Sequence, residues 1–183
     1  DVCSSDLNKT DVTFEVMSDG SIYEIWLPVD CPVCLKYLSV DKEAEFSIVE
    51  DRRMKWVTYG SSITQCAAAH SPARTWPGTA ARMHDLNLTC LGYGGNCHLE
   101  TIVGMMVRDL PADIYTLKLG INIQGNGSLN ARTLQPAVIG IVKLIRERHP
   151  ETPIGIITPI ISPPREKNKN DVDLSLCDFR GHI

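Results

Sequence analysis

The sequence predicts an α/β protein with a parallel sheet, and two observations carry this prediction. Short apolar runs, rich in β-branched or aromatic residues, recur at 56–59, 88–91, 114–119 and 154–158. Helical patterns fill the intervals, at about 76–84, 98–110 and 134–149. Strands that alternate with helices of this length are typical of βαβ units, in which helices cover both faces of a parallel sheet.

The part of the chain before the first of these runs has a different pattern. Apolar residues tend to alternate with polar ones across 11–49, and turn signals occur at Asp19-Gly20 and around Pro32. This pattern predicts several short strands. A charged stretch at 50–55 follows, so we expect a small β-rich segment over 8–54 and an α/β domain over 55–183.

The composition is that of an ordinary globular chain. The 183 residues are 43% hydrophobic and 22% charged, with a net charge of -4. The slight acidity argues against a nucleic-acid partner, which would need clustered Lys and Arg. No apolar run approaches the roughly 20 residues of a membrane helix, and no export signal is visible, so we expect no membrane span and a cytoplasmic location.

Cysteine usage favours reduced thiols, because seven cysteines are too few and too scattered for a disulfide scaffold. Cys31 and Cys34 have the spacing of half a zinc site, but the sequence offers no second pair. We therefore predict neither a metal nor a cofactor.

Both ends of the sequence look artificial. Residues 1–7, DVCSSDL, match a translation of the sequencing-adapter sequence GACGTGTGCTCTTCCGATCT, so we interpret them as an assembly scar on an environmental gene. The helical pattern near the C-terminus stops within about three turns. We therefore expect the α/β domain to be incomplete.

Three polar or Gly-rich loops follow the first three predicted strands of the α/β part. They read GSSIT at 60–64, GYGGN at 92–96 and GINI at 120–123. Ligands of parallel sheets bind beyond the carboxyl ends of the strands, so we expect these loops to share one rim.

The three loops offer the groups that acyl transfer needs, a nucleophilic oxygen and donors for the developing oxyanion. We expect Ser62 to attack. Its own N–H, the N–H of Gly95 and the side-chain amide of Asn122 would form the oxyanion hole. Gly95 lets the backbone approach closely, and an Asn amide donates without a charge to desolvate. For Ser62 the alternative is a capping hydroxyl at the strand-to-helix junction.

These loops resemble the first three blocks of the SGNH, or GDSL-type, esterase family, in the right order. TWPG, RDLPADI, LKLGIN and SPPRE are similar to a bacterial branch in which a β-sandwich-like segment precedes the hydrolase domain. The resemblance spans 55–183 and implies a flavodoxin-like three-layer fold, truncated at its C-terminus. It makes 8–54 the tail of the β-sandwich segment.

The sequence departs from the family at three points. Ser61 stands at the family's usual Asp before the nucleophile, and Ile123 stands where an Asp usually follows the third-block Asn. The fourth block, Asp-x-x-His, should supply the general base. Asp178 and His182 are four apart and come too early. We therefore expect the catalytic His and Asp beyond Ile183, and the 183-residue chain to be nearly inactive.

The remaining histidines receive weaker assignments. His98 is a candidate for lining the substrate pocket. His149 and His84 end predicted helices, where a cation interacts favourably with the helix dipole. His70 follows the Ser62 loop but has no counterpart in the family.

The leading hypothesis is a serine esterase or acylhydrolase acting on a small-molecule ester, such as an acylated carbohydrate. An acyltransferase of the same fold differs only in its acceptor. A phosphate- or flavin-binding module is the alternative from another class, because Ser- and Gly-rich loops at strand ends also bind phosphates. The sequence contains neither a Walker-type Lys-Ser/Thr nor a Gly-x-Gly-x-x-Gly motif.

Overall fold

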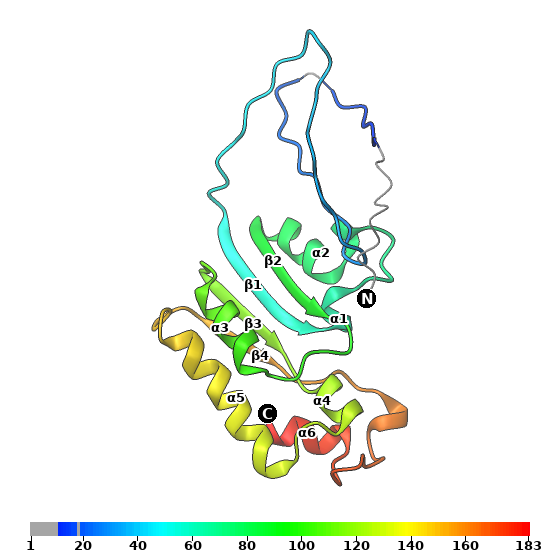
Figure 1. The fold of residues 1–183 in the computed structure, drawn as a ribbon, viewed down its shortest axis with the longest axis vertical. Helices are drawn as coiled ribbons and strands as arrows, with labels where there is room; N and C mark the ends of the chain where they lie inside the picture. The colour runs from blue at the N-terminus through cyan, green and yellow to red at the C-terminus, as the bar shows by residue number, and fades with distance from the viewer. Residues whose placement is uncertain (1–10, 18) are drawn as a thin grey trace. The chain divides into compact units, whose positions relative to one another are not determined.

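The computed structural model describes residues 11–17 and 19–183 (Figure 1). The chain divides into two compact units, and Trp26–Cys34 with Glu50–Ile183 form the larger one. This larger unit holds every helix and strand found in the described residues. It is the part that contains the three loops.

A four-stranded parallel sheet forms the centre of the larger unit. Its strands are β1 (Met54–Ser61), β2 (Leu86–Tyr93), β3 (Ile114–Lys118) and β4 (Ile154–Ile157), in the order β2-β1-β3-β4. The chain moves from β1 to β2 on one side and then crosses back to β3 on the other. The direction therefore reverses between β1 and β3, which is the point where open α/β sheets bind ligands.

One face of the sheet carries the main apolar core. Tyr59, Tyr115 and Leu117 point to this face and are fully buried. Two helices cover them, α3 (Thr101–Asp109) and α5 (Ala131–Arg146), through an apolar stripe that includes Val107 and Ile141 (Figure 1). The helical spacing of apolar residues in the α5 sequence predicts this stripe.

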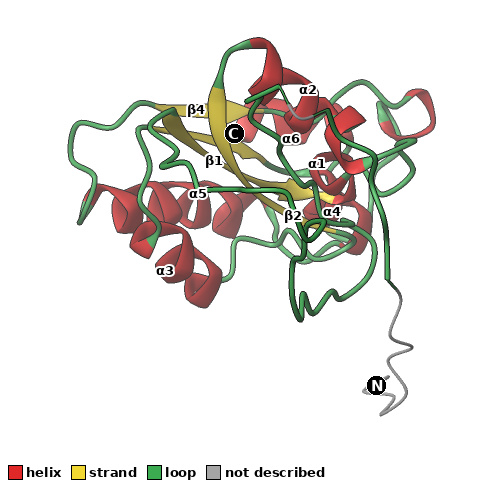
Figure 2. Cartoon of the chain, turned by 90° about the horizontal axis from the view of Figure 1, so that it is seen from above, coloured by secondary structure: helices red, strands yellow, loops and turns green. Residues whose placement is uncertain are grey.

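The opposite face carries α1 (Ser62–Gln65) and α2 (Trp76–Met83), which gives the three layers visible in Figure 2. Two tryptophans join α2 to the sheet, because the rings of Trp56 and Trp76 lie 6.0 Å apart. The indole of Trp76 donates to the carbonyl of Ile63 at 2.8 Å. A short 3-10 turn, η1 (Pro72–Arg74), leads into α2.

Helix α1 lies so close to the sheet that two strand positions must be glycine. A Cβ atom on Gly92 would lie 2.1 Å from the backbone nitrogen of Gln65, and one on Gly60 would lie 2.2 Å from the hydroxyl of Thr64. Gly60 and Gly92 are register partners on neighbouring strands. Because neither residue has a side chain, the turn after β1 packs directly against the backbone of these two strands.

Two further helices complete the unit, α4 (Ile121–Asn126) directly after β3 and α6 (Leu176–His182) near the end of the sequence. The 3-10 turn η2 (Pro163–Arg165) follows β4. The carboxylate of Glu166 forms an ion pair with Arg180 of α6 and accepts a hydrogen bond from the backbone N–H of Ser162 at 2.8 Å. This contact ties α6 to the segment after β4.

The α/β class is confirmed, and the four strands and three helices form close to the predicted ranges, although α5 begins and ends three residues earlier than predicted. Helix α3 begins at Thr101 rather than at 98. The reason is local, because Leu99 adopts a left-handed conformation (φ +66°) and the N–H of His98 donates to the side chain of Glu100. These contacts keep 98–100 out of the helix.

The strands predicted across 11–49 are not formed. Residues 11–17 and 19–53 contain neither strand nor helix in the structure. Their alternating apolar side chains stay exposed, including Phe14 at 67% and Ile48 at 93%. An alternating pattern yields a strand only where a neighbouring strand pairs with it, and no such partner occurs among the described residues. The scar predicted at 1–7 lies outside the described residues.

No helix within the described part of the chain has both the length and the hydrophobicity needed to cross a bilayer.

We expect Glu166→Gln to lower the melting temperature at neutral pH. The Arg180 guanidinium, with help from the N–H of Ser162, holds the pKa of the Glu166 carboxyl below its ordinary value. A carboxyl whose pKa is lowered by folding stabilises the folded state at pH values above its unfolded pKa of about 4.3. This stabilisation is lost as the pH falls through the pKa of the folded state. When thermal unfolding is measured from pH 7 to pH 3, the melting temperatures of the wild type and Glu166→Gln should converge.

The control is Glu151→Gln, since Glu151 is exposed and has no ion pair in the described residues. It should follow the wild type at every pH. A difference between wild type and Glu166→Gln that persists at pH 3 would contradict the role assigned to the ion pair.

We expect Gly92→Ala to destabilise the protein by about 1–3 kcal/mol, the usual cost of forcing a methyl group into packed structure. Here the methyl meets backbone atoms of Gln65, which cannot rotate away. Gly140→Ala in α5 is the matched control, because nothing lies within 4 Å of its Cβ position. It should stabilise the helix by about 0.5–1 kcal/mol. Urea unfolding of both variants measures the difference, and equal stabilities would contradict the close contact.

Candidate active site

Ser61 and Ser62 have different environments at the end of β1. Ser61 is fully buried, and its hydroxyl caps α1 by accepting a hydrogen bond from the N–H of Ile63 at 3.2 Å. Ser62 is exposed, and its hydroxyl has no hydrogen-bond partner within the described residues. The capping function therefore belongs to Ser61, which leaves the hydroxyl of Ser62 unengaged.

The second loop is a tight turn over Tyr93-Gly94-Gly95-Asn96. The N–H of Asn96 donates to the carbonyl of Tyr93 at 3.2 Å, and Gly95 has φ +74°. A type II turn needs a positive φ at its third residue, a position that favours glycine. Gly95 is thus required by the turn itself.

This turn lies directly against the serine. A Cβ atom on Gly94 would be 3.8 Å from the Cβ of Ser62 and 2.8 Å from the side-chain oxygen of Gln65. The loop after β2 therefore meets the loop after β1, as expected from their shared rim.

The third loop joins the segment after the second loop through Asn122, the second residue of α4. Its side-chain oxygen accepts a hydrogen bond from the backbone N–H of Cys97 at 3.1 Å. A backbone N–H can face only the oxygen of the amide, so the NH₂ group of Asn122 is the end that remains available. This NH₂ group has no partner in the described part of the chain. It can donate to a ligand.

His98 contacts the turn after β2. Its Nε2 lies 2.9 Å from the carbonyl oxygen of Gly95, and its Nδ1 lies 2.7 Å from the hydroxyl of Ser128. The sequence places His98 beside the second block but carries no signal for these partners, because Ser128 is 30 residues away. Asn96 has a role that the sequence analysis leaves open, since its side-chain NH₂ donates to the carbonyl of Gly94 at 2.9 Å.

Asp178 is occupied by a structural role. Its carboxylate accepts hydrogen bonds from the N–H and the hydroxyl of Ser175, at 2.9 and 2.7 Å, and so completes the capping box of α6. Capping is a sufficient reason for an Asp at this position. His182 lies in the last turn of the same helix.

His149 also serves the fold. Its Nε2 lies 2.9 Å from the carbonyl of Arg108, and its ring packs edge-on against Tyr115 at 5.2 Å. Neither His182 nor any other described histidine forms a hydrogen bond with Ser62.

Two other reactive groups near the rim are buried. Burial raises the pKa of the Cys97 thiol to about 11, so this cysteine is not a thiolate nucleophile near neutral pH. Lys118, at the end of β3, is only 8% exposed, and burial lowers the pKa of its ammonium. Neither competes with Ser62 for an approaching ligand.

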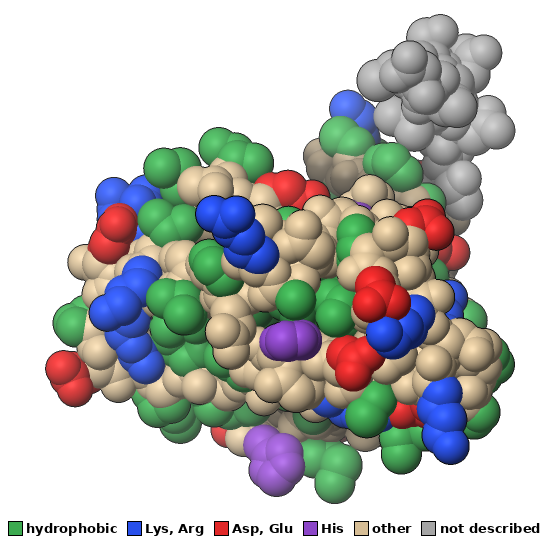
Figure 3. All heavy atoms as spheres, turned by 90° about the horizontal axis from the view of Figure 1, so that it is seen from below, with side chains coloured by type: hydrophobic (Ala, Val, Ile, Leu, Met, Phe, Trp, Pro, Cys, Tyr) green, Lys and Arg blue, Asp and Glu red, His purple; other side chains and the backbone are tan. Residues whose placement is uncertain are grey.

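The described residues contain no group of three or more His, Cys, Asp or Glu side chains arranged to hold a metal ion. On the face seen in Figure 3, basic, acidic and apolar side chains are mixed.

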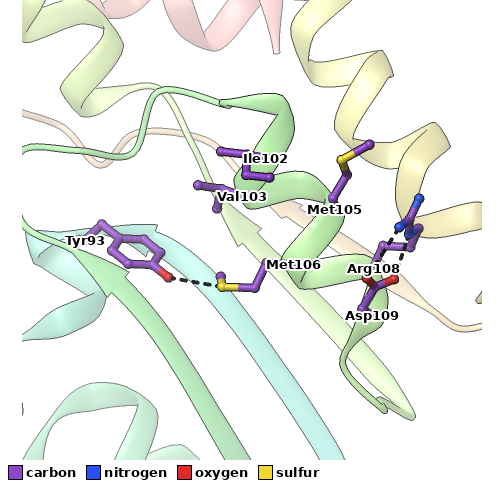
Figure 4. Close-up of a pocket in the computed structure, with 7 residues that line it drawn as sticks. All are labelled: Tyr93, Ile102, Val103, Met105, Met106, Arg108 and Asp109. Atoms are coloured by element: carbon purple, nitrogen blue, oxygen red, sulfur yellow. Dashed lines mark hydrogen bonds and ion pairs between the residues drawn. The ribbon is translucent and has the colours of Figure 1, made fainter.

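An apolar groove adjoins the turn. It is a shallow, open groove of about 460 Å³, lined by Tyr93 and one side of α3, with Arg108 and Asp109 at one end (Figure 4). The hydroxyl of Tyr93 contacts the sulfur of Met106 at 3.9 Å, and Ile102 and Val103 add further apolar surface. Because Tyr93 precedes Gly94, the groove begins next to the loop that contacts Ser62.

Comparisons with known proteins identify the family and the fold. A salicylyl-acyltransferase from a tetracycline biosynthetic pathway, SsfX3, is 34% identical with a TM-score of 0.65; the match covers 71% of this chain and 37% of that protein. A Bacteroides ovatus protein described as a GDSL-like lipase is 27% identical with a TM-score of 0.62, over 74% of this chain and 38% of the other. The chain therefore spans well under half the length of these two relatives.

The esterase AlinE4, of the SGNH-hydrolase family, shares the fold at 17% identity and a TM-score of 0.54, over 74% of this chain and 70% of its own. No curated protein matches the chain. The model of the GDSL-like lipase/acylhydrolase family matches residues 53–171, which is more than half of the sequence. The chain belongs to the GDSL-like lipase/acylhydrolase family, whose members are also called SGNH hydrolases.

Proposed function

We propose that the protein is a serine esterase, or acylhydrolase, that forms an acyl-enzyme on Ser62. The observation that carries the proposal is the placement of three loops on one rim, at the switch point of the sheet. An unengaged serine hydroxyl lies beside the Gly94-Gly95 turn. The NH₂ group of Asn122, in the loop after β3, has no partner among the described residues. Family membership supports the same chemistry.

In the proposed reaction the Ser62 oxygen attacks the ester carbonyl while its proton passes to a general base. The carbonyl oxygen becomes an oxyanion, which the N–H groups of Ser62 and Gly95 and the NH₂ of Asn122 stabilise. The alcohol leaves with a proton from the base, and water then hydrolyses the acyl-enzyme.

The general base is the part of the proposal that no described residue supplies. Asp178 caps α6, and none of the described histidines forms a hydrogen bond with Ser62. We assign the base to a histidine outside residues 11–183, oriented by an Asp as in the family's fourth block. Kinetic tests should therefore use the full reading frame of the source gene, here called the parent protein.

Ser62→Ala should abolish hydrolysis of short-chain p-nitrophenyl esters by the parent protein. It should also abolish covalent labelling by a fluorophosphonate probe, because the substitution removes the nucleophile. Ser61→Ala is the neighbouring control, which should lower stability by about 1 kcal/mol through loss of the cap while labelling persists. Equal ester turnover by wild type and Ser62→Ala would remove the proposal.

Asn122→Ala should lower kcat by about a hundredfold or more, which corresponds to about 3 kcal/mol of transition-state stabilisation. The substitution also removes the acceptor of the Cys97 N–H, so its melting temperature must be measured alongside. Asn122→Asp keeps that acceptor but replaces the NH₂ with an oxygen, and it should be equally impaired. A loss of tenfold or less in both variants would indicate a structural Asn.

An acyltransferase is the second candidate, and the resemblance to the salicylyl-acyltransferase favours it. Both activities share the acyl-enzyme and differ in whether water or an alcohol accepts the acyl group. Adding short alcohols and polyols to the ester assay, and measuring how the acyl product divides between acid and new ester, separates them.

A further inference from the structure

We propose that His98 is a positioning residue that fixes the orientation of Gly95, and so of its N–H, in the oxyanion hole. The inference rests on the proposed function, because it assigns His98 to the same reaction. It gives a role to a histidine that touches neither the nucleophile nor the predicted carbonyl oxygen of the substrate.

The contacts of the ring favour one tautomer. Nε2 lies 2.9 Å from the carbonyl oxygen of Gly95, which can only accept, so we assign Nε2 as the donor. Nδ1 of the neutral ring then accepts the hydroxyl proton of Ser128 at 2.7 Å. The side-chain NH₂ of Asn126 lies 3.2 Å from Nε2 and 3.4 Å from the Gly95 oxygen. In the assigned tautomer Nε2 cannot accept, so the Asn126 NH₂ donates to the Gly95 carbonyl as a second donor.

These bonds fix the peptide on one side of Gly95, and Asn96 fixes the peptide on the other. The side chain of Asn96 holds the carbonyl of Gly94 at 2.9 Å. In a planar trans peptide the N–H of Gly95 points opposite to that carbonyl. With His98 holding the following peptide, both dihedral angles of Gly95 are restrained. A glycine otherwise rotates more freely than any other residue, so this site needs external support.

The same ring also connects the two loops that carry the oxyanion donors. Ser128 follows α4, the helix that carries Asn122, whereas Gly95 belongs to the turn after β2. Together with the bond from Cys97 N–H to Asn122, the His98 bridge keeps the two donors at a constant separation. Small displacements of such donors are costly, since a shift of about 1 Å can lower the rate a hundredfold.

A set of substitutions at His98 separates the proposed contact from general packing. In the parent protein His98→Ala should lower kcat by about tenfold to a hundredfold with KM little changed. His98→Gln places an NH₂ group near the position of Nε2 and should recover most of the loss. His98→Asn reaches only the position of Nδ1 and should not. His84→Ala, an exposed site at the end of α2, should match the wild type.

A spectroscopic readout is independent of turnover. Long-range ¹H–¹⁵N NMR spectra of the imidazole should show the neutral His98 ring protonated at Nε2, and Ser128→Ala should change the Nδ1 shift. A ring protonated at Nδ1 would overturn the inference. So would a His98→Ala variant with the same kcat as an active wild-type protein. Loss of activity in His98→Gln equal to that in His98→Ala, with melting temperatures unchanged, would also overturn it. Absence of any Ser62-dependent turnover in wild type would instead overturn the proposed function, and this role with it.

Discussion

The site depends on the close packing of α1 against Gly60 and Gly92 in the sheet. Because Gly60 and Gly92 lack side chains, the backbone of the turn after β1 can rest directly on two neighbouring strands. The close packing of α1 on the sheet brings Ser62 next to Gly94 in the turn after β2. A side chain at either glycine would lift the helix and carry the serine away from its neighbours.

The polar groups around this contact divide into those that hold the loops and those left for a ligand. Ser61, Asn96 and Cys97 N–H are engaged in holding caps, turns and amides in place. The Ser62 hydroxyl and the Asn122 NH₂ are unengaged in the described chain. Fixed donors around an open position are the arrangement that stabilises developing charge, since the protein does not reorganise during the reaction.

The strands of the α/β part could be predicted because their apolar runs pair within the chain itself, so local pattern and tertiary environment agree. Helix α5 could be predicted because its stripe of Val138, Ile141 and Ile145 packs on the core. The start of α3 could not, because Leu99 takes a left-handed conformation that no residue pattern indicates. The strands expected at 11–49 are not formed, because an alternating pattern produces a strand only where a second strand pairs with it, and none does so among the described residues.

By itself, the sequence determined the fold class, the order of the strands along the chain and the three loops that follow them, because periodicity and Gly-rich strand ends are local properties. It also indicated Ser62, Gly95 and Asn122 as candidates. Only the tertiary structure decided that the Asn122 oxygen accepts from the N–H of Cys97 and that the His98 ring lies between Gly95 and Ser128. The physical reason is that the partners Cys97 and Ser128 are 25 and 30 residues away along the chain from Asn122 and His98, and the fold brings them together. The cap at Ser61 is a local contact, but it forms only because the backbone turns into α1 directly after β1.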